Sequence, residues 1–416
     1  MSTIYVVGAG LAGLSAAVLL AEQGAAVELI EGAPQAGGRC RSYFDPVLEQ
    51  VIDNGNHLVL SGNHSVRSYL GSIGAQDALA GPDRAEFSFA DVTSGARWTI
   101  RPNEGALAWW IFSSARRVPG SRAQDYLALV RLLLARGDKR IGEVIACEGA
   151  LWDRLLRPFL LAALNTEPQD AAAALAAAVI RESLAKGGRF YHPRIAQPTL
   201  AAAFIDPAIS FLKRQGVRVR MGERVRALTS DATRILSLQL SEGTIAVGRD
   251  DMVILAVPPW AASELVPGLV TPTQFCAIVN AHFKLAPPAG TPLMTGVIGG
   301  AAEWIFAFPD RISITVSAAD AIVDVEREEL ARRFWSDVVQ VLGTPPQLPP
   351  WQIVKERRAT FAATPDQARL RPGTQTRWTN LLLAGDWIDT GLPATIEGAV
   401  RSGHKAARLA LSRRSV

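Results

Sequence analysis

The residues best placed to do chemistry are three glycines near the start of the chain and a carboxylate after them. Gly8, Gly10 and Gly13 have the spacing G-x-G-x-x-G, and Glu31 follows at the end of the next apolar run. In this spacing the first glycine allows a tight turn, the second lets backbone approach a pyrophosphate, and the third lets helix and strand pack closely. The following helix N-terminus faces the phosphates, and an acid about 20 residues on accepts from ribose hydroxyls. The pattern predicts a dinucleotide site.

The segments around the motif predict the elements that it needs. Residues 4–7 are a short apolar run typical of a buried parallel strand, and residues 14–23 are a Leu-rich helix that Gly24 would end. A second strand over residues 26–30 leads into Glu31. The alternative is a glycine turn in an ordinary strand–helix–strand unit. Because a carboxylate repels a 2′-phosphate, Glu31 favours an unphosphorylated ribose.

The next segment, Gly37-Gly38-Arg39, resembles the flavin-binding segment of the glutathione-reductase-type flavoproteins, in the branch of the amine oxidases and phytoene desaturases. The resemblance implies that Arg39, after Gly38, approaches the diphosphate of FAD. No second G-x-G-x-x-G with an acid downstream occurs, so we do not expect a separate nicotinamide domain. No cysteine follows Cys276, which argues against a covalent flavin near the last helix. The predicted cofactor is non-covalent FAD.

The C-terminal stretch "LLLAGDWIDTGLPATIEGAV" reads as a buried strand, a turn and a helix. The same resemblance implies that Asp386 meets the ribityl–phosphate region of the flavin and that the helix begins beneath the ring. Pro393 and Thr395 can start that helix, and Gly398 permits close approach of a ring. The alternative is a strand and helix that only complete a sheet. In the favoured interpretation, the last unit of the chain closes the cofactor site that the first unit opens.

These segments predict an α/β protein: a Rossmann-like FAD-binding domain of the glutathione reductase type with a mixed α+β substrate domain. At 416 residues the chain is long enough for two domains. We predict a discontinuous FAD-binding domain over residues 1–65, 200–262 and 372–416. Residues 66–199 and 263–371 would form the substrate domain. Within the FAD-binding domain, the resemblance implies that backbone at Val225 holds the adenine.

Three further segments narrow the resemblance. They are "VIDNGNHLVLSGN" from Val51, "LAALNT" ending at Thr166, and "KERRATFAATPDQ" from Lys355. With the C-terminal motif they resemble the bacterial hydroxysqualene dehydroxylases, once named squalene-associated FAD-dependent desaturases. That implies reductive removal of the hydroxyl of hydroxysqualene, a C30 allylic alcohol, to give squalene in squalene and hopanoid biosynthesis. A carotenoid-type desaturase is the main alternative, and a flavin amine oxidase or a non-enzymatic carrier fits less well.

Such a reaction needs an acid for the departing hydroxyl, and the sequence does not identify it or the electron donor. Asp389, just after the flavin strand, is our first candidate, with a helix N-cap as its alternative role. Asn280, His282 and Lys284 share one face of a predicted strand, and amine oxidases often present a lysine to the flavin from a comparable strand. The sequence does not decide which of the three residues, if any, faces the flavin. For His282 we favour a structural role.

Composition excludes several other classes. The chain is 49% hydrophobic and 20% charged, which is typical of a globular protein with a large core. Its three cysteines have no short spacing and its five histidines are scattered, so we predict neither a disulfide framework nor a metal site. No basic run is interleaved with stacking aromatics, so a nucleic-acid partner is not expected.

One stretch predicts contact with a membrane. Trp109, Trp110 and Phe112 precede Arg116 and Arg117, and apolar aromatics beside arginines are typical of interfacial anchors. The alternative is a core segment with a solvated basic face. The net charge of +4 suits anionic lipid, no signal core precedes the first strand, and no apolar run reaches the roughly 20 residues that span a bilayer. We expect a cytoplasmic protein at the inner face of the membrane, with a hydrophobic C30 isoprenoid as substrate.

Overall fold

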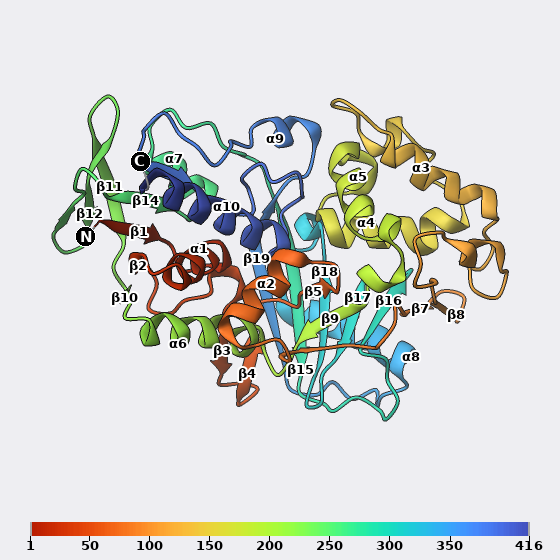
Figure 1. The fold of residues 1–416 in the computed structure, drawn as a ribbon. Coiled ribbons are helices and arrows are strands. Elements are labelled where there is room, and N and C mark those ends of the chain that lie inside the picture. Colours follow the sequence, from red (N-terminus) through yellow and green to blue (C-terminus); the bar gives the residue numbers. More distant parts are fainter. Residues whose placement is uncertain (1, 415–416) are drawn as a thin grey trace.

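The cofactor end of the molecule is built on a parallel sheet, seen in a computed structural model that describes residues 2–414. Its strand order is β10-β2-β1-β14-β20, and every neighbouring pair is parallel. Strands far apart in the sequence therefore lie side by side, as Figure 1 shows. They are β1 (Thr3–Val7), β2 (Ala26–Glu31), β10 (Arg218–Met221), β14 (Met252–Leu255) and β20 (Leu381–Leu383).

Helices cover one face of this sheet because its strands place alternate apolar side chains on each side. Ile4, Val6 and Leu29 pack against these helices in one buried cluster. The helices are α1 (Leu11–Glu22), α2 (His64–Ile73), α6 (Asp206–Arg214) and α10 (Ile396–Arg414). The other face packs on α7 (Pro259–Leu265) and on a small sheet of β11 (Val225–Ser230), β12 (Ile235–Leu240) and β13 (Thr244–Ala246).

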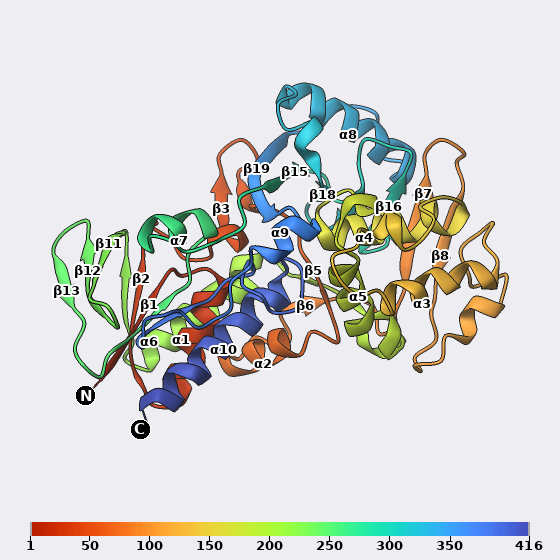
Figure 2. The same ribbon diagram turned by 90° about the horizontal axis from the view of Figure 1, so that it is seen from above.

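A seven-stranded mixed sheet forms the centre of the rest of the molecule. Its order is β19-β15-β18-β17-β16-β7-β8, and only β16 and β7 pair in parallel. Helix α8 (Arg327–Leu342) covers one face, as Figure 2 shows. Val279 and Phe283 of the sheet and Phe334 of the helix belong to one buried cluster. The strands are β7 (Phe87–Asp91), β8 (Arg97–Ile100), β15 (Phe275–Phe283), β16 (Met294–Ile298), β17 (Trp304–Ala307), β18 (Ile312–Val316) and β19 (Trp351–Phe361).

The opposite face of this sheet looks toward the cofactor end and toward a helical layer. That layer holds α3 (Leu127–Leu133), α4 (Arg157–Leu164) and α5 (Ala173–Glu182), at the end of the molecule away from β1 (Figures 1 and 2). Between the two ends lie the hairpin of β3 (Ser42–Asp45) and β4 (Gln50–Asp53) and the sheet of β5 (Leu58–Leu60), β9 (Pro193–Ala196) and β6 (Leu79–Ala80). The short helix α9 (Pro365–Arg369) precedes β20. The predicted α/β class is confirmed.

The domain boundaries proposed from the sequence stay a prediction. The packing of α2 bears on the first of them. Helix α2 lies in the same buried cluster as α1 and α10, and the Tyr69 hydroxyl donates to the carbonyl of Phe204 at 2.7 Å. This packing favours a first boundary after Ile73 rather than at residue 65. Helix α1 also begins at Leu11 rather than residue 14, because Gly10 already takes the extended N-cap conformation.

The aromatic segment before α3 divides into exposed and buried residues. Trp109 and Phe112 are 65% exposed, whereas Trp110 is only 6% exposed and packs edge-to-face on Tyr126 with ring centroids 5.3 Å apart. The prediction that all three insert into lipid is therefore wrong for Trp110, which belongs to the core. A short 3₁₀ turn over Trp109–Phe112 sends adjacent side chains in opposite directions. Within residues 2–414, no helix is long and apolar enough to cross a membrane.

This division predicts opposite results for two adjacent tryptophans. We expect Trp110→Ala to lower the free energy of unfolding by about 3–5 kcal/mol, because it empties a core site. Trp109→Ala should change that free energy by less than about 0.5 kcal/mol, because the side chain is exposed. Urea unfolding of the two variants beside the parent measures both. Equal losses from the two variants would mean that the segment is packed differently.

Candidate cofactor and active site

The glycine-rich turn at the end of β1 leaves open space where a phosphate would bind. Gly8 has φ +104°, and a Cβ there would lie 2.4 Å from the carbonyl oxygen of Ala256. A Cβ on Gly13 would lie 1.8 Å from the carbonyl oxygen of Gly8, whereas one on Gly10 would meet nothing within 4 Å. No side chain caps the N-terminus of α1. Gly8 and Gly13 thus allow close packing of the backbone, and Gly10 keeps the helix N-terminus clear for an anion.

Glu31 lies beside this turn at the end of β2. One carboxylate oxygen accepts from the backbone N–H of Ala9 at 2.6 Å, and the other accepts from Ala33 N–H at 2.8 Å. Each carboxylate oxygen has a second lone pair, so the group can also accept from ribose hydroxyls. The turn before β11 lies alongside, because Glu223 N–H donates to the Glu31 carbonyl at 2.9 Å. The structure thereby brings buried Val225 close to Glu31.

Arg39 and Asp386 join the two ends of the chain. Their ion pair spans 2.6 Å, with side chains 34% and 10% exposed. Arg39 also donates to the carbonyl of Ala359 on β19. Burial works to lower the pKa of Arg39, but the charge of Asp386 and the hydrogen bond to it outweigh burial and raise that pKa. Gly37 N–H donates to the Ala9 carbonyl at 2.8 Å, so the segment with Gly38 and Arg39 lies against the glycine-rich turn.

The turn that carries Asp386 is held by hydrogen bonds to α10 and to the Arg371 side chain. Gly385 N–H donates to the Ser402 hydroxyl on α10 at 2.8 Å. The buried guanidinium of Arg371 donates to the carbonyls of Trp387 and Ile388. Thr395 begins the last helix, since its hydroxyl accepts from Gly398 N–H at 3.0 Å. Asp386 therefore lies in a turn that is fixed to α10 and to Arg371, and its contact with the flavin stays a prediction.

Asp389 lies at a different kind of position. It is exposed, and its carboxylate accepts from Gly391 N–H at 3.1 Å within its own turn. Its backbone N–H donates to the Pro372 carbonyl at 2.9 Å. The N-cap role falls to Thr395, so that alternative for Asp389 is wrong. The catalytic assignment of Asp389 stays a prediction.

Of the three candidates on β15 or just after it, Asn280 and His282 are held in a buried polar network. The Asn280 amide donates to the Asn54 carbonyl at 3.4 Å and accepts from the Thr315 hydroxyl at 2.8 Å. His282 Nε2 donates to the Asp53 carbonyl at 3.0 Å, so Nδ1 accepts from the Ser313 hydroxyl at 2.8 Å. These bonds fix the loop after β4 to the sheet.

His282 and Lys284 differ in their charge and in their surroundings. Burial, and then the charge of Arg311, lower the pKa of His282 to about 3, so the ring is neutral and satisfied. That agrees with a structural role. Lys284 is far less enclosed and lies 3.5 Å from Glu49. The lysine therefore pairs with a surface carboxylate.

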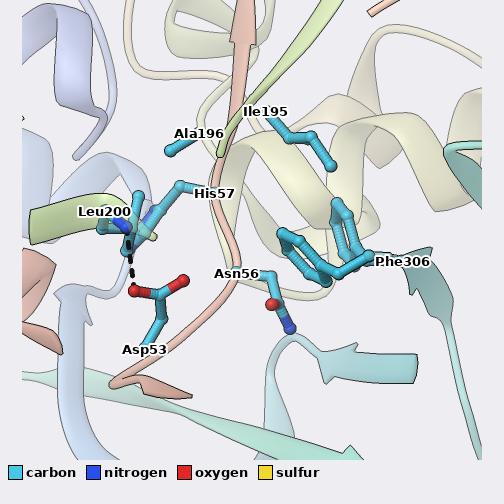
Figure 3. Close-up of a pocket in the computed structure, with 8 residues that line it drawn as sticks. Asp53, Asn56, His57, Ile195, Ala196, Leu200 and Phe306 are labelled. Carbon is cyan, nitrogen blue, oxygen red and sulfur yellow. Dashed lines mark hydrogen bonds between the residues drawn. The ribbon is translucent and has the colours of Figure 1, made fainter. Parts of the chain in front are cut away.

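A small cavity lies against the same loop (Figure 3). Its volume is about 10 Å³, room for about one water molecule. The Asp53 carboxylate accepts from Leu200 N–H at 2.9 Å, and Figure 3 shows Phe306 beside Asn56. Burial and the charge of Arg39 lower the pKa of His57 to about 4, so it is neutral at physiological pH. The cavity is lined by Asp53, Asn56, His57, Ile195, Ala196, Leu200, Phe306 and Phe308.

Several residues at this site escaped prediction from the sequence. Glu356 on β19 accepts from the Asn54 amide at 3.4 Å, and its charge acts on Arg39. Arg311 is 2% exposed and lies 3.5 Å from the Asp53 carboxylate. Glu397 on α10 accepts from the first N–H groups of α2. Glu397 and Glu356 had a signal, since each lies within a segment that carries the resemblance, but Arg311 lies in a stretch without any recognised motif.

The residues present fit a dinucleotide with a flavin. The open helix N-terminus follows Ala9, which bonds both Glu31 and the Gly37 segment that carries Arg39 to its ion pair with Asp386. Among the described residues, no group of three or more His, Cys, Asp or Glu could hold a metal ion.

Comparison with known proteins agrees with this geometry. Residues 11–411 match the family described as flavin containing amine oxidoreductase. The chain is 53% identical to a hydroxysqualene dehydroxylase of Rhodopseudomonas palustris, over 99% of this chain and 98% of that protein. It is 51% identical to the hydroxysqualene dehydroxylase of Sinorhizobium fredii, over 98% of each. A 15-cis-phytoene desaturase of an Oncidium hybrid is 24% identical, over 97% of this chain and 77% of that protein.

Among solved structures, cyclohexylamine oxidase from Brevibacterium oxydans superposes with a TM-score of 0.73 over 99% of both chains. The sequence identity is 14%, so this likeness concerns the fold alone.

We expect the purified protein to be yellow and to carry FAD without a covalent bond. Acid precipitation should release free FAD into the supernatant, where its absorbance and fluorescence are measured. Flavin that stays with the precipitated chain, or a colourless preparation that takes up no FAD, would contradict the prediction.

Glu31→Ala should weaken FAD retention. The ribose hydroxyls would lose a charge-assisted acceptor, typically worth about 1.5–3 kcal/mol. Flavin occupancy after serial dilution measures the loss. Glu22→Ala, an exposed carboxylate at the far end of α1, is the matched control and should retain FAD like the parent. Equal retention by the two variants would remove Glu31 from the site.

Proposed function

The chain belongs to the flavin-containing amine oxidoreductase family and is an FAD-dependent oxidoreductase, and we propose that its substrate is hydroxysqualene. The proposed reaction removes the hydroxyl of this C30 allylic alcohol to give squalene, in squalene and hopanoid biosynthesis. The observation that carries the proposal is identity of 51–53% over almost the whole chain with proteins named hydroxysqualene dehydroxylase.

The reaction needs one proton and one hydride for each molecule of alcohol. The proton leaves with the hydroxyl as water, and the hydride replaces the hydroxyl on carbon. Reduced FAD, when bound, supplies that hydride. The protein must therefore bind the alcohol beside the cofactor, deliver a proton to its oxygen and keep other water away from the allylic cation.

The chain's own residues suit part of this task. Ile195, Leu200 and Phe306 line the small cavity beside His57, and apolar side chains of this kind would keep water away from a cation formed next to them. Burial and the charge of Arg39 keep His57 neutral, so the ring itself is not the source of the proton. Asp389 remains our candidate proton donor, and its exposed carboxylate can exchange protons with solvent.

A carotenoid-type desaturase is the second candidate function, favoured by the full-length but distant likeness to phytoene desaturase. It would use the same cofactor and an apolar substrate but take hydride from carbon. The much closer likeness to the dehydroxylases favours reduction.

We place this enzyme in the cytoplasm at the inner face of the membrane. Both hydroxysqualene and squalene are long hydrocarbons that partition into lipid, so an enzyme acting on them gains from contact with a bilayer. The formal charge of +4 favours the anionic cytoplasmic surface.

The direction of the chemistry can be tested with detergent-dispersed substrates. Under anaerobic conditions, hydroxysqualene should re-oxidise the photoreduced enzyme and yield squalene, because a protonated hydroxyl leaves far more readily than hydride. Squalene should not reduce the oxidised enzyme at a comparable rate. Stopped-flow flavin absorbance and product extraction measure the two directions.

Isotope placement distinguishes the mechanisms further. Flavin reduced in heavy water should put deuterium on the former carbinol carbon, provided that mixing is faster than exchange at N5. Deuterium elsewhere, or bleaching of oxidised flavin by squalene or phytoene, would move the assignment to a desaturase.

A further inference from the structure

We propose that residues 107–136 form a docking face for an anionic lipid bilayer. This docking face consists of Leu107, Trp109 and Phe112 together with the outer side of α3 and the arginines around it. It lies at the end of the molecule opposite the parallel sheet, where α3 is seen in Figures 1 and 2.

Apolar exposure in the protein is concentrated on this face. Among the described residues, half of the large apolar side chains that are exposed fall between positions 107 and 134. Trp109 and Phe112 contact each other, with ring centroids 6.2 Å apart. The exposed fractions are 67% for Leu107, 65% for Trp109 and Phe112, 56% for Leu127, 48% for Val130 and 71% for Leu134.

The outer side of α3 continues the exposed aromatics. Leu127, Val130 and Leu134 follow the spacing i, i+3, i+7, which places them in one stripe. Leu132 points the other way and is fully buried. A helix of a water-soluble protein normally turns such a stripe toward the core. Here the stripe remains open while the opposite side is already packed.

Unpaired positive charges surround the stripe. Arg116, Arg131 and Arg136 are exposed, and none lies within 4.0 Å of a carboxylate in residues 2–414. Aromatic and aliphatic side chains that insert, with arginines that meet headgroups, are the composition of an interfacial anchor. A second copy of the chain would suit this face poorly, since a two-fold contact brings the same arginines together.

The docking face is linked by a few contacts to a segment that lines a cleft. Asn103 contacts both segments. Its side-chain amide donates to the Leu107 carbonyl at 2.7 Å, and its backbone carbonyl accepts from Gly188 N–H at 2.9 Å. His192 lies 3.0 Å from the Glu104 carboxylate and immediately precedes Pro193. Pro193 lines a cleft of about 260 Å³ whose other lining residues are Gly81, Pro82, Glu86, Ser88, Pro292, Leu293 and Met294.

The cleft and the inner cavity are lined by residues of the same or paired strands. Met294 in the cleft pairs directly with Phe306, which lines the cavity beside His57. Strand β9 lines both spaces, through Pro193 and then Ile195. If the proposed function holds, docking would bring a hydrocarbon substrate in the lipid close to these strands. The docking itself does not depend on that function.

The test uses the FAD-loaded protein and sedimentation with vesicles of phosphatidylcholine containing phosphatidylglycerol. The parent should co-sediment with these vesicles and much less with pure phosphatidylcholine. Trp109→Ser combined with Phe112→Ser should lower the partition coefficient by about 10- to 100-fold, because two apolar anchors no longer insert. Arg116→Gln, Arg131→Gln and Arg136→Gln together should lower it at least about tenfold and reduce its salt dependence.

Controls separate docking from folding and from catalysis. Leu236→Ser with Val270→Ser changes side chains that are 46% and 59% exposed elsewhere, and should leave binding unchanged. The aromatic double variant should keep the parent's flavin spectrum and its re-oxidation by hydroxysqualene in detergent. Loss of that activity in both proteins would count against the function but not the docking.

Two outcomes would overturn the docking proposal. One is equal vesicle binding by the parent and the aromatic double variant. The other is that light scattering finds the parent as a dimer and the double variant as a monomer, while the parent binds vesicles only weakly.

Discussion

The ion pair between Arg39 and Asp386 is the constraint on which the cofactor site depends. Two charged groups that are largely withdrawn from water are stable only when paired, and here the partners lie 347 residues apart in the chain. Arg39 is at once bonded to β19 through the Ala359 carbonyl. The glycine-rich turn, the last helix and the edge of the seven-stranded sheet therefore take their positions together. None of these segments could form its part of the site alone.

Close backbone packing makes that pairing geometrically necessary. A Cβ on Gly403 of α10 would lie 2.1 Å from the Ala12 carbonyl of α1, so the first and last helices touch without side chains between them. Behind them, the Asp53 carboxylate, Arg311 and the ring of His282 fix the loop after β4 to the central sheet. Backbone contact and a buried polar network thus position one cofactor site from two sheets.

Much of the cofactor site could be predicted because the spacing of its residues along the chain indicates it. Gly8, Glu31 and Asp386 each lie at a fixed place in a strand–turn–helix unit, so the sequence indicates their roles before any tertiary contact is known. The rest depends on contacts that no spacing encodes. Trp109 and Trp110 have the same composition around them, and only a 3₁₀ turn and the ring of Tyr126 decide which is buried. Glu356 joins the site through a strand register, and Asp389 bonds within its own turn.

The same physical arrangement explains why one scaffold can serve reduction or oxidation of hydrocarbons. Holding a flavin needs the glycines, Glu31 and the Arg39–Asp386 pair, and none of these contacts distinguishes the two directions. An apolar wall such as Ile195 and Phe306 protects an allylic cation however that cation is formed. Direction must therefore come from the substrate's leaving group and from a proton source close enough to use it. Burial and the charge of Arg39 keep His57 unprotonated at physiological pH, so the proton must come from another group. Selection between the two reactions thus acts on a few groups at the rim of the site, while the fold beneath them stays unchanged.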